Sequence, residues 1–155
     1  MYHESMPDTT PDQVASAILE TVPPTMRAIR EQMRSARVAG LSVPQFRLMR
    51  FVRRNPGTGL SALAEHLGTT MPAASQLVER VVRAGFLTRE QHPTEHRRVE
   101  LRVTDAGAAA LAQCDERTRA WLCERLDGLD PEQLEAIATA LRQVRSVVER
   151  ERPKG

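Results

Sequence analysis

Several features are scarce in this chain of 155 residues, and each scarcity narrows what the protein can be. No stretch of about 18 consecutive apolar residues occurs, so the sequence holds no candidate transmembrane helix. The start, MYHESMPDTTPDQ, lacks the basic and apolar regions of a secretory signal, and we therefore expect a cytoplasmic protein. The two cysteines, Cys114 and Cys123, lie on opposite faces of one expected helix and cannot form a disulfide with each other there.

The sequence also lacks the arrangements that enzymes need. It has no Gly-rich phosphate loop, no nucleophile in a recognisable elbow and no paired-carboxylate motif, so we expect no enzyme and no cofactor. His92 and His96 lie close together, with Glu95 beside the second. Their spacing aligns metal ligands only on a helix, and Pro93 with its turn-forming neighbours disfavours a helix. We therefore expect no metal site.

Charge is nearly balanced over the whole chain, with 22 basic and 20 acidic residues, but it is unevenly distributed. Residues 47–104 contain ten arginines and five glutamates, whereas the flanks contain twelve basic and fifteen acidic residues. A basic middle between acidic flanks indicates a surface that meets a polyanion, although a merely solvated surface can have the same composition.

Helix signals dominate what the sequence does contain. Asp12 is expected to cap a first helix, in which Pro23-Pro24 predicts either a kink or a restart before Gly40. Ser42 and Gln45 have the spacing of a capping box, in which each side chain bonds the other residue's backbone N–H. They predict the start of a second helix.

Two further helices, joined by a short turn that contains glycine, predict a helix-turn-helix. Ser61 can cap the first of them, and Gly68 can end it in a left-handed conformation. Thr69 or Thr70 can cap the second, which has Pro72 in its first turn and Gly85 just past its end. The second helix of such a pair supplies the recognition surface.

Residues 86–104, FLTREQHPTEHRRVELRVT, predict a β-hairpin. The run from Val99 to Val103 alternates apolar and charged residues, which is the pattern of a half-buried strand. Turn-forming residues separate this run from an earlier β-like run, Phe86 to Gln91, whose alternation is poorer. The tip ends in two adjacent arginines, Arg97 and Arg98, which an ordinary hairpin does not need.

Two helices are expected after the hairpin. Thr104 can cap one that runs to about Leu126, and Asp130 can form a capping box with Gln133 at the start of the last. The last helix has an apolar seam in steps of three and four residues. It is too short to be stable alone and is expected to dock on another helix, in a symmetric dimer. The expected dimerisation residues are Ile18, Leu134, Ile137, Leu141, Val144 and Val148.

The order helix, short helix, turn, recognition helix and basic-tipped hairpin is that of a winged helix-turn-helix. Residues 42–107 strongly resemble the MarR family of bacterial transcription regulators. The most specific pieces are LSALAEHLG, PAASQLVERVVRAGFL, and a Pro-x-acid-x-Arg wing followed by a strand ending in Thr-x-x-Gly. The expected fold is mainly α with a small β-hairpin wing. Its expected parts are a disordered start (1–11), an N-terminal dimerisation helix (12–40), a DNA-binding domain (41–104) and C-terminal dimerisation helices (105–152).

The resemblance implies that a homodimer binds a pseudo-palindromic operator. The helix that begins near Thr70 would enter the major groove, and Arg97 would enter the flanking minor groove. A narrow minor groove attracts a guanidinium, which supports the second assignment independently. Two residues depart from the family pattern: the wing acid is Glu95 rather than aspartate, and Gln76 stands where many members have arginine. Glutamine pairs with adenine rather than guanine, so a different operator base is plausible.

The apolar stripe of the recognition helix leaves one face for DNA. Thr70 can cap the helix, contact a phosphate, or do both. Arg80 either contacts DNA or simply lies on a solvated face of the helix. The expected DNA-binding residues are Thr70, Met71, Ala73, Gln76, Arg80, Arg97 and Arg98.

The resemblance further implies repression that is relieved by a small, often aromatic or phenolic ligand, bound between the dimer helices and the DNA-binding lobe. Phe46, Met49 and Trp121 are candidate lining residues, with a place in the core as the alternative. Cys114 or Cys123 could be a redox sensor, and the alternative for Cys114 is an apolar position on its helix. The alternative function is a helical protein-interaction module, which predicts affinity for a protein partner and indifference to duplex DNA.

Overall fold

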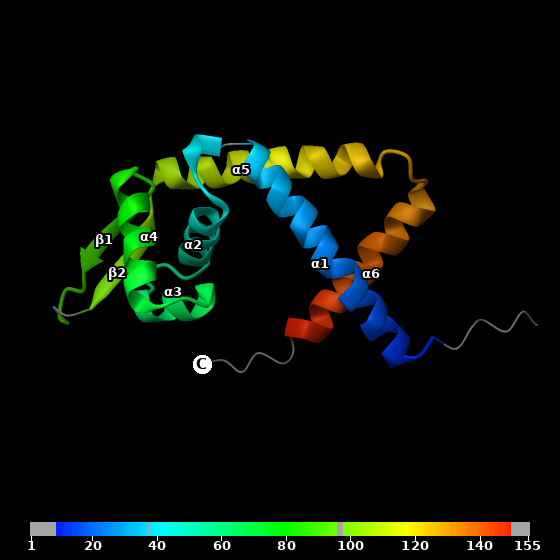
Figure 1. Ribbon diagram of the computed structural model, residues 1–155, viewed down its shortest axis with the longest axis horizontal. Helices are drawn as coiled ribbons and strands as arrows, with labels where there is room; N and C mark the ends of the chain where they lie inside the picture. Colours follow the sequence, from blue (N-terminus) through cyan, green and yellow to red (C-terminus); the bar gives the residue numbers. More distant parts are fainter. Residues whose placement is uncertain (1–8, 37, 96–97, 150–155) are drawn as a thin grey trace, which may run out of the picture. The chain divides into compact units, whose positions relative to one another are not determined.

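The computed structural model describes residues 9–36, 38–95 and 98–149 (Figure 1). Within them lie six α-helices, a short 3-10 helix and a two-stranded antiparallel sheet, which confirms the predicted fold class. The chain forms two compact units, one up to Thr118 and one from Arg119. The helices are α1 (Pro11–Ala36), η1 (Val38–Gly40), α2 (Val43–Arg54), α3 (Leu60–Leu67), α4 (Met71–Arg83), α5 (Asp105–Leu126) and α6 (Pro131–Glu149), and the strands are β1 (Leu87–Gln91) and β2 (Val99–Val103).

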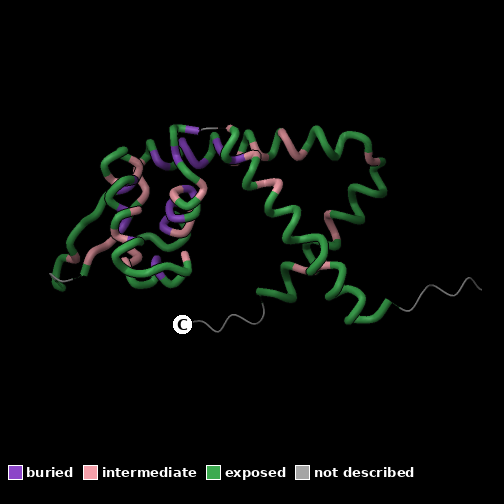
Figure 2. The backbone as a smooth tube through the Cα atoms, viewed as in Figure 1, coloured by how far each residue is buried: buried purple, intermediate pink, exposed green. Residues whose placement is uncertain are grey.

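The hydrophobic core lies in the first unit (Figure 2). It forms where α2, α3, α4, the hairpin and the first half of α5 place their apolar residues together. Each large side chain that is fully buried contributes about 1.5–3 kcal/mol relative to an exposed one. The largest of them are Phe46, Leu48, Met49, Leu63, Leu101, Leu111, Val38, Val52, Val78, Val81 and Cys114.

Most predicted helix ends are confirmed. Ser42 and Gln45 form the capping box of α2, and Gly68 leaves α3 in a left-handed conformation with φ 64°. The Thr70 hydroxyl accepts a hydrogen bond from the Ala73 backbone N–H at 3.3 Å. Local side-chain chemistry therefore sets these ends, as the sequence indicated.

Two predicted caps are wrong. The first helix begins two residues earlier than Asp12 implied, because Thr10 and Gln13 form a capping box. The Gln13 side chain accepts from the Thr10 N–H at 2.9 Å, and the Gln13 N–H donates to the Thr10 hydroxyl at 3.3 Å. The cap of α3 is Gly59 rather than Ser61. Thr58, the residue before it, pairs with Leu101 of β2, so the chain enters α3 from a fixed strand position.

The predicted restart of the first helix is also wrong, since α1 runs through Pro23 and Pro24 without a break in the helix. A proline removes an N–H donor, and the carbonyl that it leaves needs another partner. Most of this part of α1 is exposed, so water can bond such carbonyls. The Thr25 hydroxyl also donates to the Thr21 carbonyl at 2.7 Å, which adds a hydrogen bond around the proline pair.

The hairpin is tied at its base to the helices on either side. Leu87 pairs with Val103 in the antiparallel register. The Thr104 hydroxyl donates to the Gly85 carbonyl at 2.7 Å and accepts from the Gly107 N–H at 3.1 Å, so it caps α5 as predicted. A Cβ atom on Gly107 would lie only 2.2 Å from the Phe86 carbonyl oxygen. Only glycine therefore allows α5 to approach the start of the wing this closely.

Candidate nucleic-acid interface

The outward face of α4 is exposed as the periodicity predicted. Met71 is 45% exposed, and Ala73, Gln76 and Arg80 are also exposed. The opposite face packs into the core through three buried residues, Ala74, Val78 and Val81. The helix thus presents a mixed apolar, amide and cationic surface, which suits contact with base edges and phosphates. The DNA-binding role of these residues stays a prediction.

Thr70 acts as the helix cap that the sequence indicated, because its side chain already accepts the Ala73 N–H. This bond orients the hydroxyl at the start of α4. A phosphate contact is compatible with the cap, since a hydroxyl oxygen can accept one hydrogen bond while its hydrogen is donated elsewhere. The contact itself stays a prediction.

The wing loop is described on both sides of its tip, while His96 and the predicted minor-groove residue, Arg97, lie outside the described residues. Arg98 is exposed, and its guanidinium lies 3.8 Å from the Glu95 carboxylate. Both side chains are more than half exposed, so the pair stabilises the loop only weakly. The ion pair instead orients the side chain of Arg98, one of the two wing arginines.

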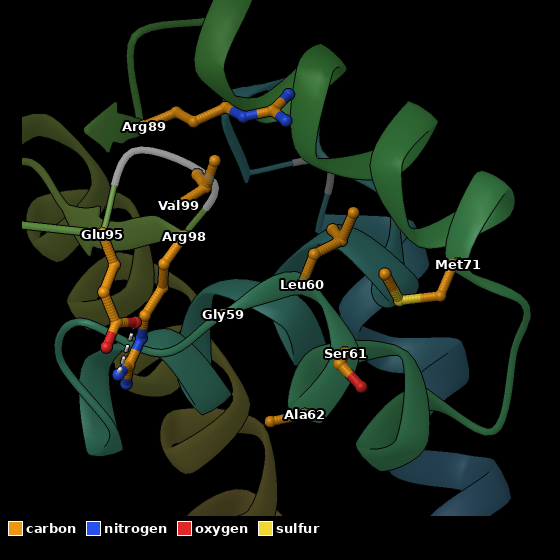
Figure 3. A pocket seen from close by; sticks show the side chains of 9 residues that line it. All are labelled: Gly59, Leu60, Ser61, Ala62, Met71, Arg89, Glu95, Arg98 and Val99. Carbon is orange, nitrogen blue, oxygen red and sulfur yellow. Dashed lines mark ion pairs between the residues drawn. The ribbon is translucent and has the colours of Figure 1, made fainter. Parts of the chain in front are cut away.

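A groove of about 850 Å³ joins the wing to the two helices of the helix-turn-helix (Figure 3). The starts of α3 and α4 contribute Leu60 and Met71, and the wing contributes Arg89 and Arg98. The groove therefore combines an apolar floor with two guanidinium groups. Its lining residues are Gly59, Leu60, Ser61, Ala62, Met71, Arg89, Glu95, Arg98 and Val99.

Sequence reasoning missed Arg89 as a residue of this surface. From the sequence, Arg89 is only one of the ten arginines of the basic segment, residues 47–104. Arg89 lies in β1, whose alternation of apolar and polar residues is poor, so its direction could not be deduced from the sequence. Its pairing with Leu101 in the hairpin register is what fixes its direction in the structure.

The three candidate pocket residues do not share an environment. Phe46 and Met49 are fully buried in the hydrophobic core, which accounts for them as core residues, the alternative interpretation. Trp121 belongs to the second unit, where the Arg125 guanidinium stacks over its ring at 3.9 Å. The burial of the two first-unit residues is thus explained without a ligand.

Cys114 is buried in the same core. The next residue, Asp115, forms an ion pair with Arg50 of α2. Burial raises the pKa of the Cys114 thiol, and the nearby Arg50 guanidinium opposes this effect only in part. A raised pKa keeps the thiol protonated and unreactive near neutral pH. This environment favours the core interpretation of Cys114 over the redox one.

The predicted dimerisation residues are mostly exposed. On α6 no residue is buried, and Leu141 and Val148 are 64% and 67% exposed. Leu134 and Ile137 are about two-fifths exposed, and Val144 is half-buried. Ile18 of α1 is likewise half-buried, beside exposed apolar neighbours. Apolar surface of this extent is typical of a contact with a second protein chain.

Two kinds of feature are absent from the described part of the chain. Within residues 9–36, 38–95 and 98–149, no three His, Cys, Asp or Glu side chains are grouped so as to hold a metal ion. In the same residues, no helix combines the length and the apolar character that crossing a membrane requires.

Comparison with known proteins finds a family match for the central segment of the chain. Residues 39–98 match the family model described as "MarR family". Over 77 residues the chain is 27% identical to the "putative transcriptional regulatory protein for hcr operon" of Thauera aromatica, a match that covers 50% of this chain and 46% of that protein. A second curated relative is also covered over less than two thirds of its length, at 63%.

Solved structures share the fold of this protein over most of the chain. The transcriptional regulator Tm0710 of Thermotoga maritima superposes with a TM-score of 0.72 at 23% identity, over 89% of this chain and 96% of that one. FabT of Streptococcus pneumoniae, solved in complex with DNA, superposes with a TM-score of 0.63 at 15% identity, over 91% and 99%. The resemblance to the MarR family is confirmed over residues 39–98, which include the recognition helix and the first strand of the wing.

Proposed function

We propose that this protein is a sequence-specific DNA-binding transcriptional regulator, and not an enzyme. The observation that carries the proposal is that Met71 of the recognition helix and Arg98 of the wing line one continuous groove, although 27 positions separate them in the sequence. The family match supports a regulatory role, and the FabT complex supports DNA as the ligand of this fold. Such a regulator would act in the cytoplasm, where bacterial DNA lies.

The exposed face of α4 would read base edges in the major groove. Gln76 can bond an adenine through both atoms of its amide, and Met71 and Ala73 can contact a thymine methyl group. Arg80 and Thr70 would meet phosphates on either side, which fixes the register of the helix on the duplex. In the adjacent minor groove, Arg97 would respond to groove width rather than to a base.

A homodimer would place two such surfaces on one operator. The exposed apolar seam of α6 supports this assembly, because five of its residues face one side of the helix and none is buried within the described chain. Two-fold symmetry then requires a pseudo-palindromic operator with half-sites about one turn of B-DNA apart.

We further propose that a small aromatic or phenolic effector relieves repression. The groove between α3, α4 and the wing offers what such a molecule needs, namely an apolar floor for a ring and the Arg89 guanidinium for an acidic group. A ligand in this groove would occupy the surface that the proposed DNA contacts share. Binding of the ligand and of the operator would therefore be mutually exclusive, which is the energetic condition for induction.

The decisive experiment is a titration of the purified protein against two duplexes at about 150 mM salt. One duplex carries the sequence upstream of the protein's own gene, and the other is a scramble of it. We expect preference for the first by at least about 10³-fold, the lower end for specific regulators. Equal, weak binding of both duplexes, repeated with genomic fragments selected for binding, would contradict sequence-specific regulation.

The helical interaction module is the second candidate function. The exposed apolar residues of α6 favour it as much as they favour a dimer. It differs in predicting no affinity for duplex DNA at any salt concentration. Absence of binding in the titration, even at low salt, would therefore select this alternative.

A further inference from the structure

His92 has a position in the wing that neither a metal site nor a DNA contact explains. Its ring is largely buried for a loop residue, with 25% of the side chain exposed. The Nδ1 atom lies 3.4 Å from the backbone nitrogen of Thr94 and 3.2 Å from that of Glu95. The imidazole therefore sits inside the turn that it begins.

These two contacts assign the hydrogen of the ring. A backbone N–H can only donate, so Nδ1 must be the acceptor of both bonds and carries no hydrogen itself. The Thr94 hydroxyl, 3.2 Å from the same atom, can donate to it as well. A neutral imidazole has one hydrogen, and it must then be on Nε2.

The Nε2 side of the ring faces a carboxylate on β2. Glu100 Oε1 lies 3.6 Å from Nε2, and Glu100 Oε2 accepts a hydrogen bond from Arg102 at 3.2 Å. The Glu100 side chain is only 19% exposed, so the interaction is better shielded from water than the Glu95–Arg98 pair. Strand β2 thus holds the ring from one side while the ring holds the turn from the other.

The loop closes around this ring. The His92 N–H donates to the Arg98 carbonyl at 2.8 Å, and the Arg98 N–H donates to the Glu95 carbonyl at 2.8 Å. Glu95, the acceptor of the second bond, also donates its own N–H to the ring. The imidazole and the backbone of Arg98 are therefore linked through a single residue.

We propose that His92 is a positioning residue of the wing. Its ring, with Nδ1 accepting from the loop backbone and Nε2 beside Glu100, holds the Thr94–Glu95 turn and so sets the backbone from which Arg98 extends. The last step, presentation of the arginine to DNA, rests on the function proposed above. The placement of the ring does not depend on that function.

Protonation of the ring should release the turn. A hydrogen on Nδ1 would point at two N–H donors, so both bonds would be lost, while the attraction of Nε2 to Glu100 would increase. The charged groups around the ring are Glu100 and Arg102 on β2 and Glu95 and Arg98 in the loop. The positioning role therefore belongs to the ring whose Nδ1 atom is free to accept.

The tautomer can be measured without DNA. NMR spectra that correlate each ring nitrogen with the carbon-bound ring protons two bonds away distinguish a protonated Nε2 from a protonated Nδ1. They would be recorded on the full chain, labelled with ¹⁵N in the histidines. At about pH 8, where imidazole is neutral, we expect His92 in the Nε2–H form, with the Thr94 and Glu95 amides protected from exchange. The opposite tautomer, or an averaged signal with unprotected amides, would overturn the placement.

Three variants test the positioning role. His92→Ala removes the acceptor, His92→Asn replaces it with an oxygen that can accept from an N–H two residues on, and Gln91→Ala is the matched control on the neighbouring residue. At about pH 8 we expect His92→Ala to bind the operator about tenfold more weakly at an unchanged unfolding midpoint. His92→Asn and Gln91→Ala should stay close to the native protein.

Rescue by His92→Asn separates positioning from a merely structural role. His92→Ala should lose preference for the operator over a scrambled duplex while its unfolding midpoint stays unchanged, and His92→Asn should keep most of that preference. Equal loss of preference in the two variants, or native affinity in His92→Ala, would refute the proposal. If no variant and no native protein bound the duplex, the proposed function would fail, and the tautomer would still decide the placement of the ring.

Discussion

Helices α2 and α6 begin with the same kind of cap, but their apolar faces lie in opposite environments, one buried and one exposed. Each starts with a capping box, Ser42 with Gln45 and Asp130 with Gln133. Each carries apolar residues at helical spacing, yet four residues of α2 are buried and none of α6 is. Local chemistry thus makes both helices, but only α2 has neighbours within its own unit that bury its apolar face (Figure 2). The apolar face of α6 is the surface that we propose pairs with another chain.

The largest effect should come from Gly107, which lies in the well-packed region. In Gly107→Ala, the added methyl group meets the Phe86 carbonyl oxygen at 2.2 Å and a Val103 methyl at 2.9 Å, and neither the backbone nor the packed valine can move cheaply. We expect a loss of about 3 kcal/mol in the free energy of unfolding, or failure to fold. Urea unfolding followed by circular dichroism measures it.

Gly128→Ala is the matched control, because a Cβ atom there would meet nothing within 4 Å. We expect it to change the free energy of unfolding by less than about 0.5 kcal/mol. Equal effects of the two substitutions would contradict the difference in packing between the wing base and the turn before α6.

The second prediction concerns α6 itself. Leu141 is 64% exposed, so Leu141→Asp removes little packing within the described chain, but it places a carboxylate in the proposed dimer seam. We expect the dimer to weaken by about 2 kcal/mol or more, giving monomer in sedimentation velocity at micromolar concentration. Gln143→Asp adds the same charge off the seam and should leave the dimer intact. A dimer that survives Leu141→Asp would remove this seam from the interface.

The third prediction asks which region carries DNA affinity. Arg97→Ala should weaken operator binding and lower the slope of log affinity against log salt by about one, since one phosphate-equivalent contact is lost. Arg145→Ala removes the same charge from α6, where the guanidinium pairs with Glu149, and should leave both quantities nearly unchanged. Unchanged binding in Arg97→Ala would remove the tip arginine from the mechanism.

Features that depend on residues close together in the sequence could be predicted, and features that depend on distant residues could not. The caps at Ser42, Thr70 and Asp130 each depend on residues within one turn, and all three are confirmed. The cap at Ser61 was wrong because a distant strand decides where α3 begins, through the pairing of Thr58 with Leu101. Such a contact has no local signal in the sequence.

The candidate site divides in the same way. The outward face of α4 followed from helical periodicity and is exposed as predicted. The groove and the His92 network could not be predicted, because they need the hairpin register and the approach of the wing to the start of α3. His92 was considered only as a metal ligand, since its spacing from His96 is a local pattern and its contact with Glu100 is not.

The smallest effect expected is chemical and leaves the fold intact. Cys114 is buried in the core and Cys123 is exposed in the second unit, so the two thiols report on the two regions separately. Burial raises the pKa of Cys114, which leaves little thiolate near neutral pH, and it also blocks access of a reagent. We expect a thiol reagent at about pH 7.5 to label Cys123 rapidly and Cys114 only in denaturant. Cys123→Ser should abolish the rapid labelling, and fast reaction at Cys114 would show that the core opens far more readily than its packing implies.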